Sequence, residues 1–350
     1  HHLGKYLPLV GLESQNVRNA LLSPFSSAIP MSTPASSTNP AKSPPLTGLV
    51  AATYTPFLPN GEVNIEIIPR IVDHLARNEV AGIYICGSTG EGPSLTMEER
   101  KAVTEAYVSA NQGRMRAIVH VGHTSLADSQ ALATQALSIG ADAISAIAPY
   151  YFKLDSAATL IAYFKEVAAC APTLPFYYYH IPALTGPVVD PVAFLKQGAA
   201  TIPNLRGIKF TDSDLSLFNA CQEVDEGRFD ILFGRDEMLL SALAAGASGA
   251  VGSTYNFAPA LYMRVIRAFE AGNIEEARKW QRVAVRAIHA VLKIGGPAGL
   301  KYPMRRLGLD CGQSRLPMKQ LSVSEMQEID RRLEALGFDE WATGTNGETE

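Results

Sequence analysis

One lysine of this chain occupies a position from which it could act as a nucleophile. Lys209 lies near the end of an apolar run, 205–210, which predicts a buried β-strand. An apolar surrounding disfavours the charged amine, so burial lowers its pKa and leaves a neutral amine that can attack a carbonyl carbon. Tyr179 lies thirty residues earlier, near the end of a second strand-like run. An amine and a phenol at neighbouring strand ends predict imine chemistry on a keto acid, whereas a lysine that extends to solvent is the structural alternative.

Eight strand-like runs alternate with helical segments and would position these side chains. The runs span 49–55, 82–87, 116–122, 142–149, 175–180, 205–210, 229–234 and 249–253. This alternation predicts an α/β fold, a closed (β/α)8 TIM barrel with a C-terminal helical appendage. A doubly wound open sheet is the alternative, but it normally has a Gly-rich phosphate turn after its first strand, and here that strand ends in Thr55-Pro56-Phe57.

The two ends of the chain differ from this alternating middle. Residues 1–47 are expected to be a disordered or vector-derived extension, because the stretch 23–45 is rich in Ser, Pro, Thr and Ala. His1 and His2 are typical of a purification tag, Met31 is a candidate native start, and a targeting peptide is the alternative. The expected parts that follow are the barrel over 48–256, helices over 257–341 (259–271, 274–293, 297–307 and 324–336) and a frayed tail over 342–350.

Composition limits the classes of function. The 350 residues are 47% hydrophobic and 18% charged, with a formal net charge of -4. Such a chain has the material for a large core and nothing that attracts nucleic acid or an anionic membrane, and it has no bilayer-spanning apolar run. No metal-ligand spacing is present, so we expect no metal. Four widely separated cysteines predict free thiols in a reducing compartment: Cys86, Cys170, Cys221 and Cys311.

The candidate site lies where the predicted strands end, because (β/α)8 barrels carry their active sites at that rim. Polar and glycine residues gather there, as a small polar ligand requires. They are Ser88 and Thr89 after the second strand, Tyr150 and Tyr151 after the fourth, Tyr179 and His180 in the fifth, Lys209 and Thr211 at the sixth, Gly234, Asp236 and Glu237 after the seventh, and Ser253 after the eighth.

Two of these groups have an ordinary structural explanation as well as a functional one. The turn around Ser88 and Thr89 could bind a carboxylate through backbone N–H groups and hydroxyls, or its hydroxyls could bond their own backbone. Asp236 and Glu237 could bind sugar hydroxyls, or serve as the N-cap and first turn of a helix. Both explanations remain open for each group.

The tyrosines and histidines near the strand ends could likewise have either a structural or a chemical role. Alternate residues of a strand share a face, so Tyr177 and Tyr179 are expected opposite to Tyr178. Core packing explains most such tyrosines, but the position of Tyr179 beside the strand of Lys209 favours a chemical role. We interpret the three histidines near the strand ends as structural: His120, His123 and His180.

Four motifs occur in order along the chain: G-S-T-G-E at 87–91, Y-H-I-P-A at 179–183, G-I-K-F at 207–210 and G-S-T-Y-N at 252–256. Over 46–336 the chain resembles the pyruvate-dependent class I aldolase superfamily of N-acetylneuraminate lyase and dihydrodipicolinate synthase. The run 174–186, and L-F-G at 232–234 followed by D-E at 236–237, resemble the vertebrate-type lyase branch specifically.

The resemblance implies a role for each matched residue. Lys209 would form the Schiff base with the C2 carbonyl, and Tyr179 would move the proton during carbon–carbon cleavage, assisted by the substrate's own carboxylate. Ser88 would belong to this catalytic group and would bind that carboxylate together with Thr89. Tyr151 would also belong to the catalytic group, because it matches a tyrosine that in many relatives reaches the site of a neighbouring subunit. The polyol part of the substrate would be held by Thr211, Gly234, Asp236, Glu237 and Ser253.

The resemblance also implies the reaction: reversible cleavage of N-acetylneuraminate, a sialic acid, to N-acetylmannosamine and pyruvate. No cofactor is needed because the lysine is the electron sink. A cytoplasmic homotetramer without nucleic-acid or membrane partners is expected. The alternatives are dihydrodipicolinate synthase, another pyruvate-dependent aldolase, or a catalytically silent ligand-binding barrel. Leu184 disfavours the synthase, whose branch usually has an arginine there to bind the second substrate.

Overall fold

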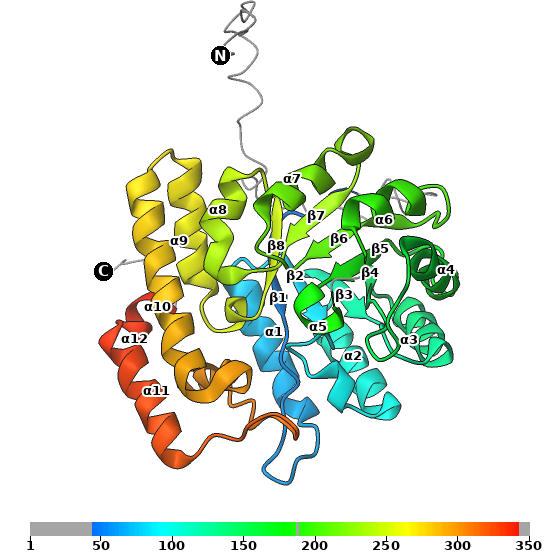
Figure 1. The fold of residues 1–350 in the computed structure, drawn as a ribbon. Coiled ribbons are helices and arrows are strands. Elements are labelled where there is room, and N and C mark those ends of the chain that lie inside the picture. The colour runs from blue at the N-terminus through cyan, green and yellow to red at the C-terminus, as the bar shows by residue number, and fades with distance from the viewer. Residues whose placement is uncertain (1–43, 187–188, 343–350) are drawn as a thin grey trace, which may run out of the picture.

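Eight parallel strands close into a barrel in which each strand pairs with its neighbours in the chain and β1 pairs with β8 (Figure 1). The computed structural model describes residues 44–186 and 189–342. The predicted (β/α)8 barrel is therefore confirmed. Its strands are β1 (Gly48–Ala52), β2 (Gly82–Ile85), β3 (Arg116–His120), β4 (Ala143–Ile147), β5 (Phe176–His180), β6 (Leu205–Phe210), β7 (Asp230–Phe233) and β8 (Gly249–Gly252).

Helices surround the barrel, and a further group of helices stands against one side of it (yellow to red in Figure 1). The surrounding helices are α1 (Ile68–Arg77), α2 (Met97–Asn111), α3 (Leu126–Ser138), α4 (Ala157–Ala168), α5 (Pro182–Thr185), α6 (Pro191–Gly198), α7 (Leu215–Gln222) and α8 (Leu239–Ala244). The further group is α9 (Pro259–Glu270), α10 (Ile274–Gly299), α11 (Val323–Ala335) and α12 (Phe338–Ala342). The predicted C-terminal helical appendage is therefore present.

Local sequence signals explain where several helices begin. The Thr96 hydroxyl accepts the N–H of Glu99, whose carboxylate accepts the N–H of Thr96, so a capping box begins α2. Asp190 caps α6 through the N–H of Val192, with Pro191 in the first turn.

One predicted helix, 297–307, is wrong as a single element. Gly296 adopts a φ of +59°, which kinks α10 and leaves Pro297 at the start of a short last turn. A separate 3-10 helix, η7 (Tyr302–Leu307), follows. The kink turns the chain toward the barrel, so that Leu300 and Lys301 reach the cavity described below.

The core has two parts, and the three consecutive tyrosines show the division. Tyr177 and Tyr179 belong to the cluster inside the barrel, whereas Tyr178 packs outward between Phe164 and Phe194. The predicted alternation is therefore confirmed.

A buried polar network closes the barrel at the amino ends of the strands. Asp230, the first residue of β7, pairs with Arg206 at 2.9 Å. It also accepts the Tyr177 hydroxyl at 2.9 Å and the N–H of Leu46 at 3.1 Å. The buried Asp230 carboxylate thus has three partners, which compensate the cost of its burial.

The predicted terminal segments fall mostly on residues outside the described part. Of the expected extension 1–47, residues 1–43 lie outside it, and Leu46 is buried in the barrel. Of the expected tail 342–350, residues 343–350 lie outside it, and Ala342 is buried at the end of α12.

The described residues also bear on the predictions from composition. All four cysteines are free thiols, as predicted. Between residues 44 and 342, leaving out 187–188, there is no cluster of three or more His, Cys, Asp or Glu side chains that could hold a metal ion. In the same part of the chain, no helix has the length and apolar character needed to cross a membrane.

Candidate active site

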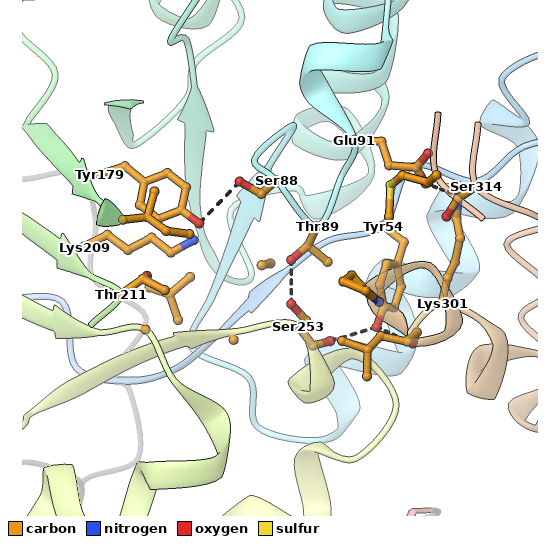
Figure 2. Close-up of a pocket in the computed structure, with 18 residues that line it drawn as sticks. Tyr54, Ser88, Thr89, Glu91, Tyr179, Lys209, Thr211, Ser253, Lys301 and Ser314 are labelled. Atoms are coloured by element: carbon orange, nitrogen blue, oxygen red, sulfur yellow. Dashed lines mark hydrogen bonds and ion pairs between the residues drawn. The ribbon is translucent and has the colours of Figure 1, made fainter. Parts of the chain in front are cut away.

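A cavity of about 220 Å³ lies at the carboxyl ends of the strands (Figure 2). Its walls come from the ends of several barrel strands and, opposite them, from the segment that follows the kink in α10. The predicted residues that line it are Ser88, Thr89, Tyr179, Lys209, Thr211, Gly234 and Ser253. The barrel thus brings together side chains that are far apart in the sequence.

Lys209 points into this cavity from β6 and is only 5% exposed. Burial lowers the pKa of its amine, while the neighbouring Tyr179 opposes that shift. The alternative in which the amine extends to solvent is wrong, because Nζ lies 3.8 Å from the ring centroid of Tyr179 and 4.1 Å from that of Tyr84. A buried amine with a lowered pKa has the character of a nucleophile.

Tyr179 lies directly beside Lys209, because these two residues are paired in register between β5 and β6. Its hydroxyl is 3.4 Å from the Ser88 hydroxyl, which belongs to the turn after β2 (Figure 2). The phenol therefore lies between the amine and the hydroxyl turn, where it can exchange a proton with a bound substrate.

The hydroxyls of the turn after β2 are directed across the barrel. Thr89 Oγ1 lies 2.6 Å from Ser253 Oγ, on the loop after β8. Ser88 reaches Tyr179, so these contacts differ from the local backbone bonding that was the structural alternative. The turn thus presents two hydroxyls at the middle of the cavity, between Lys209 and the wall formed by the segment after the kink in α10, which includes Lys301 (Figure 2).

The residues after β6 and β7 contribute to the cavity unequally. Thr211 Oγ1 is buried without a hydrogen-bond partner among the described residues, and a Cβ at Gly234 would lie 2.0 Å from it. Asp236 is buried but does not line the cavity; its carboxylate accepts the N–H and hydroxyl of Thr254 at 2.7 and 2.6 Å. Thr211 is therefore free to bond a ligand hydroxyl.

Asp236 and Glu237 lie in the first turn of a 3-10 helix, η5 (Asp236–Met238), so the expected first-turn position is confirmed, but the N-cap position expected of Asp236 is wrong. The N-cap position before this turn is Arg235, without a side-chain cap, and burial raises the pKa of Asp236 to about 6. Glu237 pairs with Arg235 at 2.7 Å, and its side chain does not line the cavity. Neither the Asp236 carboxylate nor the Glu237 carboxylate therefore lines the cavity.

The two tyrosines after β4 point to different surroundings. Tyr150 packs against the cluster inside the barrel. Tyr151 is 76% exposed and stacks edge-on against Phe152, which is 82% exposed, and neither lines the cavity. Leu184 is likewise exposed, on α5, and outside the cavity wall.

The buried histidines near the site are neutral. Burial lowers the pKa of His120 well below its usual value, and its Nε2 accepts the N–H of Ile147 at 3.2 Å. Burial also lowers the pKa of His180 to about 4. Both are surrounded by aromatic rings, which fits the structural role predicted for them.

Sequence reasoning missed the residues that form the opposite end of the cavity. Glu91 and Lys301 form an ion pair of 2.8 Å with side chains only 2% and 3% exposed. Tyr54 donates its hydroxyl to the carbonyl of Leu300 at 2.6 Å. Glu91 ends the G-S-T-G-E motif, but its partner lies 210 residues away, so no spacing in the sequence links them.

We expect Lys301→Met to lower the free energy of unfolding by about 3–5 kcal/mol, because it leaves the buried Glu91 carboxylate without its counter-charge. Adding Glu91→Gln should restore most of that loss. Urea denaturation measures both variants. The control is Glu275→Gln, which breaks the exposed pair with Arg278 and should leave the midpoint unchanged. A Lys301→Met protein as stable as the wild type would show that this pair contributes no net stability.

Comparisons with known proteins agree with this arrangement. Residues 45–336 match the family described as Dihydrodipicolinate synthetase family. The N-acetylneuraminate lyase of Homo sapiens is 43% identical over 300 residues, covering 84% of this chain and 93% of that protein. The structure of Proteus mirabilis N-acetylneuraminate lyase gives a TM-score of 0.82 at 38% identity, covering 84% of this chain and 100% of that one. The structure of a dihydrodipicolinate synthase from Bacillus anthracis gives a TM-score of 0.77 at 28% identity, covering 83% of this chain and 98% of that one.

Proposed function

The chain belongs to the dihydrodipicolinate synthetase family, and on that premise we propose that it is an N-acetylneuraminate lyase, which cleaves N-acetylneuraminate reversibly to N-acetylmannosamine and pyruvate. The observation that best supports this proposal is the buried amine of Lys209, which lies over the ring of Tyr179 in a cavity lined by hydroxyl groups. The identity to curated lyases favours this branch of the family over the synthase branch.

The reaction begins at the amine. Lys209 Nζ adds to C2 of the open-chain keto acid, and loss of water gives a protonated imine. Ser88 and Thr89 bind the adjacent carboxylate through their hydroxyls. Thr211 and Ser253 bond hydroxyls of the sugar-derived part, and Gly234 leaves the space that this part needs.

Cleavage then uses the imine as an electron sink. Tyr179 takes the proton of the C4 hydroxyl while it passes its own phenolic proton to the substrate carboxylate, the C3–C4 bond breaks, and the electrons of that bond form an enamine at C2–C3. N-acetylmannosamine leaves as the aldehyde. Protonation of C3 and hydrolysis of the imine then release pyruvate and the free amine.

The deciding experiment is pyruvate release from N-acetylneuraminate, followed with lactate dehydrogenase and NADH. Steady release is the expected result. Consumption of pyruvate with aspartate semialdehyde, without cleavage of N-acetylneuraminate, would instead assign the synthase reaction. No cleavage, with pyruvate still trapped on Lys209 by borohydride, would assign another aldolase of the family.

We further propose a cytoplasmic homotetramer in which Tyr151 contacts another subunit. The four free thiols suit a reducing compartment. The exposed pair of Tyr151 and Phe152 is an apolar surface of the kind that subunit contacts cover. Light scattering after size-exclusion chromatography tests the assembly, and a monomeric mass would contradict it.

A further inference from the structure

Two aromatic faces bracket the reacting nitrogen of Lys209. The ring centroid of Tyr179 lies 3.8 Å from Nζ, and that of Tyr84 lies 4.1 Å from it. Tyr84 comes from β2, whereas Tyr179 comes from β5, so the two rings reach the amine from different strands of the barrel. The mechanism above assigns a task to Tyr179 and none to Tyr84.

The position of Tyr84 is fixed by its neighbours. Its side chain is almost fully buried, and its hydroxyl donates to Ser145 Oγ at 2.9 Å. A Cβ at Gly87 would lie 2.6 Å from the ring, so the ring fills the space that this glycine leaves open. The rings of Tyr84 and Tyr179 meet edge to face at 5.9 Å. Lys209 Nζ lies over the ring of Tyr84, so the amine meets the face of this ring, whereas the hydroxyl of Tyr84 is bonded to Ser145.

The charge on this nitrogen changes during the reaction. A neutral amine and a ketone, with one proton, give a protonated imine and water, so the nitrogen becomes cationic. Tyr179 and Asp236 act electrostatically on Lys209, and Lys209 acts in turn on His120. The carboxylate of Asp236 is bonded to Thr254, and the His120 imidazole is neutral because burial lowers its pKa. An aromatic face attracts a cation through its quadrupole, and the attraction is strongest where water is excluded.

We propose that the face of Tyr84 stabilises the protonated imine on Lys209, which makes Tyr84 a further catalytic residue of the reaction. This inference rests on the proposed function only in requiring that Lys209 forms an imine with pyruvate. The ring acts on the cationic intermediate and takes no part in proton transfer. It therefore supports both directions of the reversible cleavage.

The test weakens the face of the ring while it preserves the shape of the side chain. Tyr84→Phe retains the face, and mono-, di- and trifluorophenylalanine at the same position reduce its negative potential in steps. For each protein, borohydride trapping over a range of pyruvate concentrations measures imine formation, and kcat/KM measures cleavage. We expect Tyr84→Phe to stay within about threefold of the wild type, and the fluorinated series to fall linearly on a logarithmic scale, by about 10- to 30-fold at the trifluoro derivative.

The matched control is the same series at Tyr178, which is buried on the outward face of β5 between Phe164 and Phe194. It should leave trapping and kcat/KM unchanged. Tyr84→Leu removes the face altogether and should lose at least as much as the trifluoro derivative. If this variant fails to fold, the fluorinated series still decides, since unfolding midpoints report folding for each of its members.

Two results would overturn the inference. The first is a flat fluorinated series at position 84. The second is a Tyr84→Phe protein that loses as much as Tyr84→Leu, which would assign the effect to the hydroxyl and its bond to Ser145. Either result would leave the proposed function intact if the wild type cleaves N-acetylneuraminate. A wild type that traps pyruvate without cleaving the sugar acid would contradict the proposed function, and the trapping series would still test Tyr84.

Discussion

Replacing Lys209 by methionine is expected to lower the rate of pyruvate release from N-acetylneuraminate by at least about 10⁴-fold. Methionine is about as long as lysine and apolar, so it fills the buried space beneath Tyr84 and Tyr179 without offering a nucleophile. Without the imine, the electrons of the breaking C3–C4 bond have no acceptor. The remaining interactions of the cavity can bind the substrate but cannot supply that acceptor.

The same variant separates chemistry from folding. Removing an amine from an apolar interior removes a desolvation penalty, so the unfolding midpoint should stay the same or rise. Borohydride reduction with pyruvate followed by peptide mass spectrometry should label Lys209 in the wild type and leave the variant unlabelled. Lys165→Met, on the exposed side of α4, is the control and should retain both rate and label. A Lys209→Met protein with undiminished turnover would disprove the imine mechanism.

Replacing Tyr179 by phenylalanine is expected to lower kcat for cleavage by about 10²- to 10⁴-fold. The substitution removes the hydroxyl that lies 3.4 Å from Ser88 Oγ but keeps the ring beside Lys209 Nζ. Proton transfer from the C4 hydroxyl is therefore impaired, whereas the ring that contacts the amine is retained.

Trapping of pyruvate on Lys209 provides the distinguishing measurement. In Tyr179→Phe, trapping should remain within about threefold of the wild type although cleavage is slow, because imine formation needs the amine and not the phenol proton relay. Tyr178→Phe is the matched control, since Tyr178 is the next residue of β5 and faces the helices. Equal losses in trapping and cleavage would show instead that the phenol acts in forming the imine.

Local patterns in the sequence were sufficient to predict the fold. The strands follow from short continuous apolar runs, which are buried at every position in β4, β5 and β6, and the helices follow from longer segments between those runs, so both signals depend on neighbouring residues. The capping box at Thr96 and the N-cap at Asp190 are local for the same reason. The helix expected over 297–307 was wrong because Gly296 and Pro297 permit a kink but do not set its direction.

The sequence by itself singled out the two residues from which we propose that the chemistry starts. Lys209 stands out because a lysine is unusual in an apolar strand, and Tyr179 stands out because its strand ends beside that of Lys209 and parallel strands bring their ends to one rim. The hydroxyls of Ser88 and Thr89 follow by the same argument. Motif resemblance added the polyol positions, of which Thr211, Gly234 and Ser253 line the cavity and Asp236 and Glu237 do not.

Only the tertiary structure decided which distant side chains complete the cavity. Closure of the barrel places the face of Tyr84 over Lys209, and the kink in α10 places Lys301 against Glu91. The tertiary structure also brings the Asp236 carboxylate to Thr254, so this carboxylate does not cap its own helix. These contacts join residues whose separation along the chain has no fixed period, so the sequence contains no local signal for them. They form because the packed fold brings these side chains together, and burial favours packing in which polar and charged groups have a partner.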